Sequence, residues 1–167
     1  LTAGILPGAI NVGTDGLPSS QAHQTWVPAG LDPIVNIPTT APGSSGAARI
    51  GNVRNLRGVE LLSKTFVVTP AVSTITFWYA VVFQNPPEPM SQQPIFWVRV
   101  TDASGNIVPG AFDFGAATGD RLIADSTNPF FQTQMGTTYP NVTIPSTTIL
   151  FKDWSAAQID LSAQIGN

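Results

Sequence analysis

The segment that decides the fold is Ser73-Thr74-Ile75-Thr76-Phe77-Trp78-Tyr79-Ala80-Val81-Val82-Phe83. It is rich in β-branched and aromatic residues and ends shortly before Pro86-Pro87, so it predicts a long β-strand. Residues 94–101 predict a second strand, in which alternate residues from Ile95 point to one side and those from Phe96 to the other. Residues 102–106 contain Asp, Ser, Gly and Asn and predict a turn, after which a strand resumes at Ile107.

Strand signals outside this centre are shorter. They cover residues 26–28, 34–37, 65–69, 147–152 and 154–161. Pro33 and Pro38 bracket the second of these, which favours an edge position. No window of a dozen residues carries a 3.6-residue period, and the nearest candidate for a short helix is 52–64. Many short strands between turn signals predict an all-β fold, an antiparallel β-sandwich of the jelly-roll type.

Charge is scarce in this chain of 167 residues. Charged residues make up 10%, against about 25% in a typical domain. The seven basic residues do not gather with aromatics, so neither nucleic acid nor an anionic membrane surface is an expected partner. No apolar run approaches the roughly 20 residues that span a bilayer, so membrane insertion is not expected. The absence of Cys excludes disulfides and thiolate metal sites.

Several segments resemble a known family. They are residues 48–52, 73–86, 93–106, 151–154 and 159–166, which include Val98-Arg99-Val100-Thr101-Asp102 and Ile159-Asp160-Leu161-Ser162. Together they resemble a jelly-roll-like module of large Bacteroidetes cell-surface proteins, which often carry type IX secretion or gliding-motility-associated C-terminal domains. The resemblance covers roughly residues 47–167. It implies an extracellular location on the bacterial cell surface and a structural or adhesive role.

The chain departs from this family in two respects. The family often has a Cys after the segment that matches 98–106, and it continues past Ile165-Gly166 into another strand and a Gly/His-rich segment. Either the family's final strands lie outside this sequence or they are supplied from elsewhere, so we expect residues 47–167 to form the sandwich core, with or without its final strands, and residues 1–46 to be a loop-rich segment of the same domain. A sheet that lacks strands has an open edge, so we expect a neighbouring subunit to donate a strand and build a fibre.

Residues that carry chemistry are few, and no catalytic residue or enzymatic activity is predicted. A Ser-His-Asp triad would have to use His23, the single histidine, which lies in a Ser/Gln-rich stretch typical of a solvated loop. Calcium is the candidate cofactor, because it binds carboxylate, amide and backbone carbonyl oxygens. Two candidate ligand sets are Asp102 with Asn106, and Asp120 with Asp125. Ordinary turns are the structural alternative for both sets.

Aromatic side chains supply candidate ligand sites. Trp26, Trp154 and Tyr139 lie beside turns or in a long loop, where exposed rings suit the apolar faces of sugars. Trp78 and Trp97 lie inside strong strands and are expected in the core. The sequence leaves two functions open. One is a structural or adhesive module whose partners are neighbouring subunits or domains, and the alternative is a carbohydrate-binding module that takes glycans, with calcium as a candidate ion.

Overall fold

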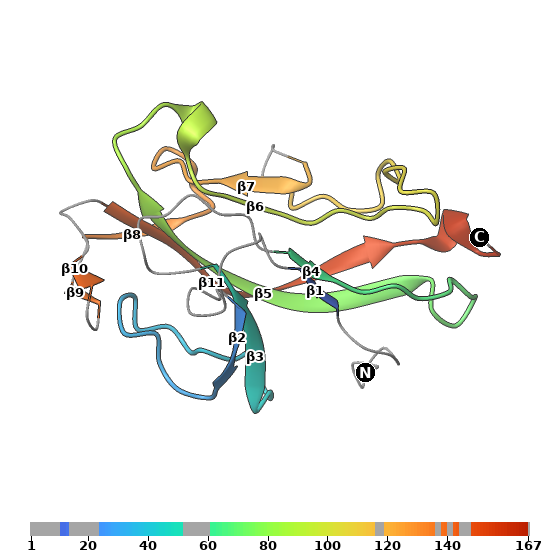
Figure 1. The fold of residues 1–167 in the computed structure, drawn as a ribbon, viewed down its shortest axis with the longest axis horizontal. Coiled ribbons are helices and arrows are strands. Elements are labelled where there is room, and N and C mark those ends of the chain that lie inside the picture. The colour runs from blue at the N-terminus through green and yellow to red at the C-terminus, as the bar shows by residue number, and fades with distance from the viewer. Residues whose placement is uncertain are drawn as a thin grey trace. The chain divides into compact units, whose positions relative to one another are not determined.

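The computed structural model describes residues 11–13, 24–51, 61–115, 119–135, 138–139, 142–143 and 148–166. This part of the chain is strand-rich and its only helical turns are η2 and η3, so the predicted all-β class is confirmed (Figure 1). The strands are β1 Asn11–Gly13, β2 Gln24–Pro28, β3 Gly46–Ile50, β4 Leu61–Ser63, β5 Thr74–Asn85, β6 Ile95–Trp97, β7 Arg121–Ile123, β8 Gln132–Met135, β9 Thr138–Tyr139, β10 Val142–Thr143 and β11 Thr148–Asp160, and the 3₁₀ turns are η2 Met90–Gln92 and η3 Ser162–Gln164. All paired strands run antiparallel.

The chain divides into two compact units. Unit 1 comprises Leu1–Phe66 with Thr138–Thr143, and unit 2 comprises Val67–Thr137 with Ile144–Asn167. The boundary expected between residues 46 and 47 falls inside β3, in unit 1. That residues 1–46 and 47–167 belong to one domain stays a prediction.

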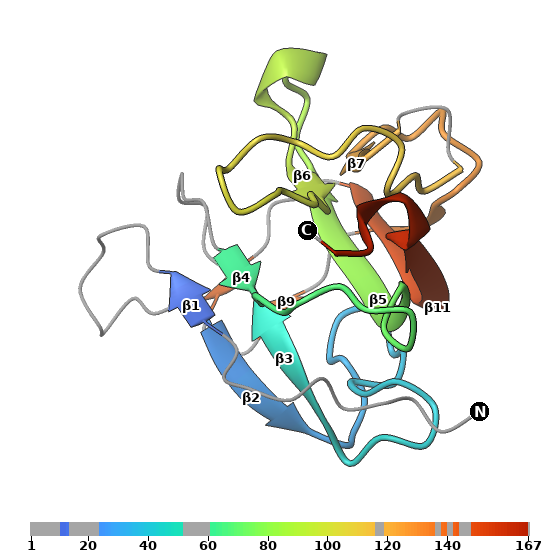
Figure 2. The same cartoon turned by 90° about the vertical axis from the view of Figure 1, so that its right-hand side faces the viewer.

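The described residues of unit 1 form three separate strand pairs, β1 with β4, β2 with β3, and β9 with β10. Figure 2 shows β2 and β3 side by side, and Trp26 lies opposite Ala48 in their register. Residues 52–60 of the helix candidate lie outside the described residues, but Leu61–Ser63 is a strand, so a helix extending to residue 64 is wrong.

The strand expected at residues 34–37 is also wrong, because these residues form a turn. The Asp32 carboxylate accepts hydrogen bonds from the backbone N–H groups of Ile34 and Val35, each at 2.9 Å. Asn36 has a φ of 60°, the left-handed region that Asn tolerates better than most residues. Asp and Asn thus compete here with strand formation, although Ile34, Val35 and Ile37 are buried.

Unit 2 is built on a three-stranded sheet in the order β5–β11–β8. Residues 147–152 and 154–161, expected as two strands, are one strand, β11. Its register against β5 shifts between Lys152 and Ser155, where Asp153 and Trp154 together oppose Ala80. This is a β-bulge, an extra residue that lets a strand continue instead of ending.

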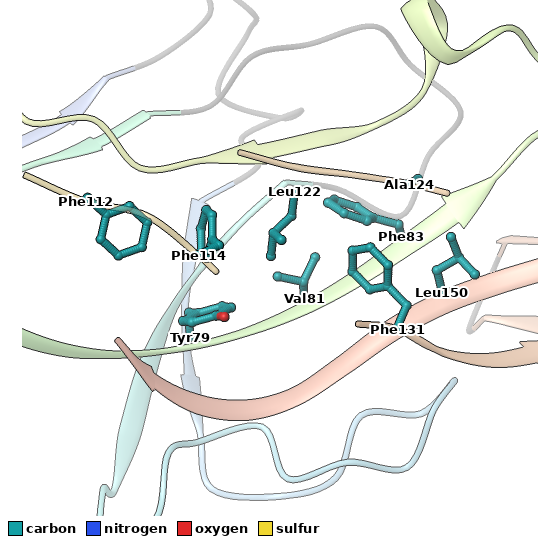
Figure 3. Packing of buried hydrophobic residues seen from close by; sticks show 9 residues of the cluster. All are labelled: Tyr79, Val81, Phe83, Phe112, Phe114, Leu122, Ala124, Phe131 and Leu150. Carbon is teal, nitrogen blue, oxygen red and sulfur yellow. The ribbon is translucent and has the colours of Figure 1, made fainter. Parts of the chain in front are cut away.

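The pair β6–β7 covers one face of this sheet, and the core lies between them (Figures 1 and 3). Every second residue of β5 faces the core, from Phe77 through Tyr79 and Val81 to Phe83. Leu122 of β7 and Leu150 of β11 are fully buried among them. The core is rich in aromatic residues, and several of its rings meet edge-on, as Phe112 and Phe114 do at a centroid distance of 4.7 Å. Burial raises the pKa of the Tyr79 hydroxyl.

The expected strand and turn over residues 94–108 are largely confirmed. The ladder proper covers only Ile95–Trp97, but the N–H of Val98 still donates to the Asp120 carbonyl at 2.9 Å. Phe96 and Val98 pack against the core from the same side of the strand, as the alternation allows, whereas Trp97, which was expected in the core, points to the other side. The strand expected at 65–69 is wrong, since its only described pairing is a tight bridge between Thr69 and Val72.

Candidate functional site

Trp26 is the more exposed of the two tryptophans predicted as ligand residues. It lies on β2 of unit 1, and 72% of it is accessible to solvent. Its indole packs against Gly46, which is buried and lies diagonally across the ladder, so that a Cβ at Gly46 would collide with the ring. An aromatic ring that covers a cross-strand glycine in this way stabilises the sheet while the rest of the ring stays in water.

Trp154 and Tyr139 lie elsewhere. Trp154 is half-buried in the β11 bulge of unit 2, where its backbone N–H donates to Asp153 Oδ1 at 2.7 Å. Tyr139 belongs to β9 of unit 1 and pairs through its backbone with Val142. Trp154 therefore belongs to a different unit from Trp26 and Tyr139.

The first candidate calcium pair, Asp102 and Asn106, closes a hairpin. Asp102 Oδ1 accepts the backbone N–H groups of Ser104 and Asn106, at 2.8 and 2.9 Å, and Oδ2 accepts the Asn106 side-chain amide at 3.0 Å. The Asn106 side chain is the main cause of the lowered pKa of Asp102, with backbone N–H groups adding to it. Gly105 takes the positive φ of 84° that the turn needs. Both carboxylate oxygens are therefore engaged within the turn.

The second candidate pair, Asp120 and Asp125, lies at opposite ends of β7. An extended segment of five residues spans roughly 16 Å, several times the distance from a calcium ion to its ligands. Asp120 instead contacts Arg99 Nε at 3.6 Å and Arg121 Nε at 3.2 Å. Asp125 Oδ1 accepts the backbone N–H and the hydroxyl of Thr127, at 2.8 and 2.7 Å. The structure thus does not bring this pair together.

Among the described residues, no group of three or more His, Cys, Asp or Glu is placed to hold a metal ion. In the ranges that the structure covers, no helix has the length and apolar character to cross a membrane. His23 lies outside these ranges.

Trp78 lies at the surface, so its predicted place in the core is wrong. It was expected in the core, but 43% of it is exposed, because it lies on the face of β5 opposite the core. The signal was present in the sequence, since Phe77 and Tyr79 occupy the other side of the alternation. Trp97 is half-buried, and the Arg99 guanidinium carbon lies 5.4 Å from the centre of its ring.

In the described part of unit 2, β5 is the longest strand that has one edge without a neighbouring strand. Within the described chain, β5 pairs only with β11 and forms one border of its sheet. Its twelve residues include no charged residue, proline or glycine. Charged residues and proline are among the features with which proteins usually protect an exposed edge from pairing, and β5 has neither.

The backbone groups on this edge can be assigned. The Leu161 N–H donates to the Ser73 carbonyl at 2.7 Å, so Ser73 points its N–H and C=O toward β11. Backbone direction alternates along a strand, so the odd-numbered residues of β5 bond to β11. The even-numbered residues Thr74, Thr76, Trp78, Ala80 and Val82 point their N–H and C=O to the open side.

No family model matches the chain, and no curated protein or solved structure shows significant similarity to it.

Proposed function

We propose that this chain is an extracellular structural or adhesive module of a bacterial surface protein, and that it joins neighbouring subunits or domains by strand pairing. The observation that carries the proposal is the open edge of β5, where the backbone groups of Thr74–Val82 on that side have no strand partner among the described residues and lie beside uncharged side chains. An extended segment that adds to such an edge gains main-chain hydrogen bonds, while alternate side chains provide specificity.

The surface of the module supports the same proposal. Trp78 and Val82, both on the solvent face of β5, are 43% and 37% exposed, so an added strand would cover apolar surface as well as form hydrogen bonds. The scarcity of charge and the resemblance to Bacteroidetes cell-surface modules favour an extracellular, non-catalytic role. The two layers of unit 2 suit an antiparallel sandwich, and we extend the proposal to the jelly-roll type.

The test compares the solution mass of the wild type and three variants by size exclusion with light scattering. We expect the wild type to associate and Ala80→Pro to be monomeric, because proline removes an N–H on the open edge without removing a bond to β11. Ala103→Pro makes the same change in the hairpin turn and should associate like the wild type. Val82→Lys places a charge on the edge without altering the backbone and should also be monomeric. A monomeric wild type, or association of both edge variants at the wild-type level, would exclude the proposal.

A second candidate function is carbohydrate binding, and the exposed indole of Trp26 favours it. The ring is held in position by Gly46 and needs little ordering on binding, which is an advantage for a sugar-stacking platform. Glycan arrays probed with the wild type and with Trp26→Ala, with and without calcium, test this candidate and its ion together. Loss of a glycan signal in Trp26→Ala supports it, and an array without any signal removes it.

A further inference from the structure

We propose that the strand that β5 receives is β5 of a second copy of this chain, antiparallel, with the two Ala80 residues facing each other across a two-fold axis. This inference rests on the proposed function and goes further, since it names the partner and the register. The two three-stranded sheets would join into one continuous sheet in the order β8–β11–β5–β5–β11–β8.

The backbone limits the registers available to such a pair. A continuous sheet with both cores on the same face requires core-facing residues, which are odd-numbered in β5, to pair with odd-numbered ones. The residues whose N–H and C=O groups point to the open side are even-numbered, so they too must pair with each other. Both conditions are met when the numbers of the paired residues add to an even sum.

The exposed side chains select one register among these. With Ala80 on the axis, Trp78 of each copy lies opposite Val82 of the other, and the small Ala80 pair separates the two contacts. The two most exposed apolar side chains of β5 then cover each other twice. If Tyr79 lay on the axis instead, Val82 would lie opposite Thr76, and if Trp78 lay on the axis, Val82 would lie opposite Thr74. In both registers Val82 would face a polar residue.

Electrostatic repulsion does not oppose the pairing of two β5 strands. The strand has no charged residue, so two copies bring no like charges into contact. A two-fold contact uses the same patch on both subunits and closes on itself. The expected product is therefore a discrete dimer, in contrast to the fibre that strand donation from one subunit to the next would build.

A single introduced cysteine tests the register, because the chain has none of its own. Ala80→Cys should form an intermolecular disulfide under mild oxidation, since directly opposite residues of an antiparallel pair lie about 5.5 Å apart between Cα atoms. Ala156→Cys is the matched control. Ala156 is exposed on the same sheet face but belongs to β11, so two copies of it would be separated by three strand spacings, roughly 14 Å across the sheet, and by a further offset along the strands.

The measurement is the rate of dimer formation on non-reducing gels, with light scattering of the reduced proteins alongside. Pairing raises the effective thiol concentration, so we expect Ala80→Cys to crosslink at least about tenfold faster than Ala156→Cys. If the chain associates and Ala80→Pro abolishes association, but the two cysteine variants crosslink equally slowly, the self-pairing inference is wrong and the proposed function stands. If the reduced proteins are all monomeric and both variants crosslink slowly, the proposed function falls as well.

Discussion

Leu150 and Ala157 face the same core from one strand, although they are seven positions apart. An odd separation places two residues of a regular strand on opposite faces. The bulge at Asp153 and Trp154 resets the alternation, so that Leu150 before it and Ala157 and Ile159 after it all contact the core. The exposed residues after the bulge are Ala156, Gln158 and Asp160.

Deletion of Asp153 should therefore be far more damaging than its substitution. Without the extra residue, Gln158 and Asp160 would turn toward the core and Ala157 and Ile159 toward solvent. We expect a loss of more than about 4 kcal/mol in the free energy of unfolding, or no folded protein. Asp153→Ala keeps the length and should lose about 1 kcal/mol or less in urea unfolding. Equal losses in the two variants would mean that the bulge does not set the alternation.

Gly46→Ala should destabilise the chain because its methyl group would collide with the Trp26 indole. Overpacking of this kind costs about 1–3 kcal/mol. Trp26→Ala removes the obstacle, so the double variant should be more stable than the sum of the two single losses predicts. A double-mutant cycle from urea unfolding measures this coupling. Additive losses would show that the ring and the glycine do not interact in solution.

Leu122→Ala should produce one of the largest losses among single substitutions in unit 2. Leu122 has no exposed surface and lies within the aromatic core, so truncation leaves a cavity. Leu→Ala changes at such sites cost about 2–5 kcal/mol. Val67→Ala in the same unit removes methyl groups from a side chain that is 73% exposed, and should change stability by less than about 0.5 kcal/mol. Comparable losses in the two variants would contradict the placement of the core.

The turn at Asp102 should loosen in acid. The Asn106 side-chain amide and the backbone N–H groups of Asn106 and Ser104 favour the carboxylate, so the pKa of Asp102 lies below its ordinary value of 3.8. A lowered folded pKa adds stability above the unfolded pKa, and this is lost as the pH falls through the folded pKa. In Asn106→Ala the pKa should rise toward its ordinary value, as followed by a carbon NMR titration of the carboxyl group. An unchanged titration would mean that the side-chain hydrogen bond is not formed in solution.

Periodicity identified the parts of the fold that bury one face. The alternation in residues 73–83 and 94–101 predicted β5 and the placement of Phe96 and Val98 on one side of their strand, because apolar burial imposes a period of two. It did not identify that side as the inward one, since Trp97 on the other side was expected in the core. The same reasoning failed where local polar chemistry competes with it. Asp32 and Asn36 turn an apolar segment into a loop, and the bulge joins two predicted strands across Asp153. A single extra residue leaves no mark in composition.

The candidate site was less predictable, because exposure depends on neighbours distant in sequence. Trp26 was expected to be exposed and is, but its support by Gly46 comes from a register that only the folded ladder reveals. Asp102 with Asn106 had the composition of either a turn or an ion site, and hydrogen bonds to both carboxylate oxygens favour the turn. The open edge of β5 depends on strand order, which no local pattern specifies.

The bulge in β11 also constrains how this chain can change over evolutionary time. A one-residue insertion or deletion between Leu150 and Ala157 would reverse the faces of the β11 residues that follow it, so such changes should be eliminated by selection. The exposed hairpin at residues 102–106 carries no such constraint and can vary in length. Homologous sequences should therefore align without gaps along β11 and accumulate their length differences at the hairpin tip.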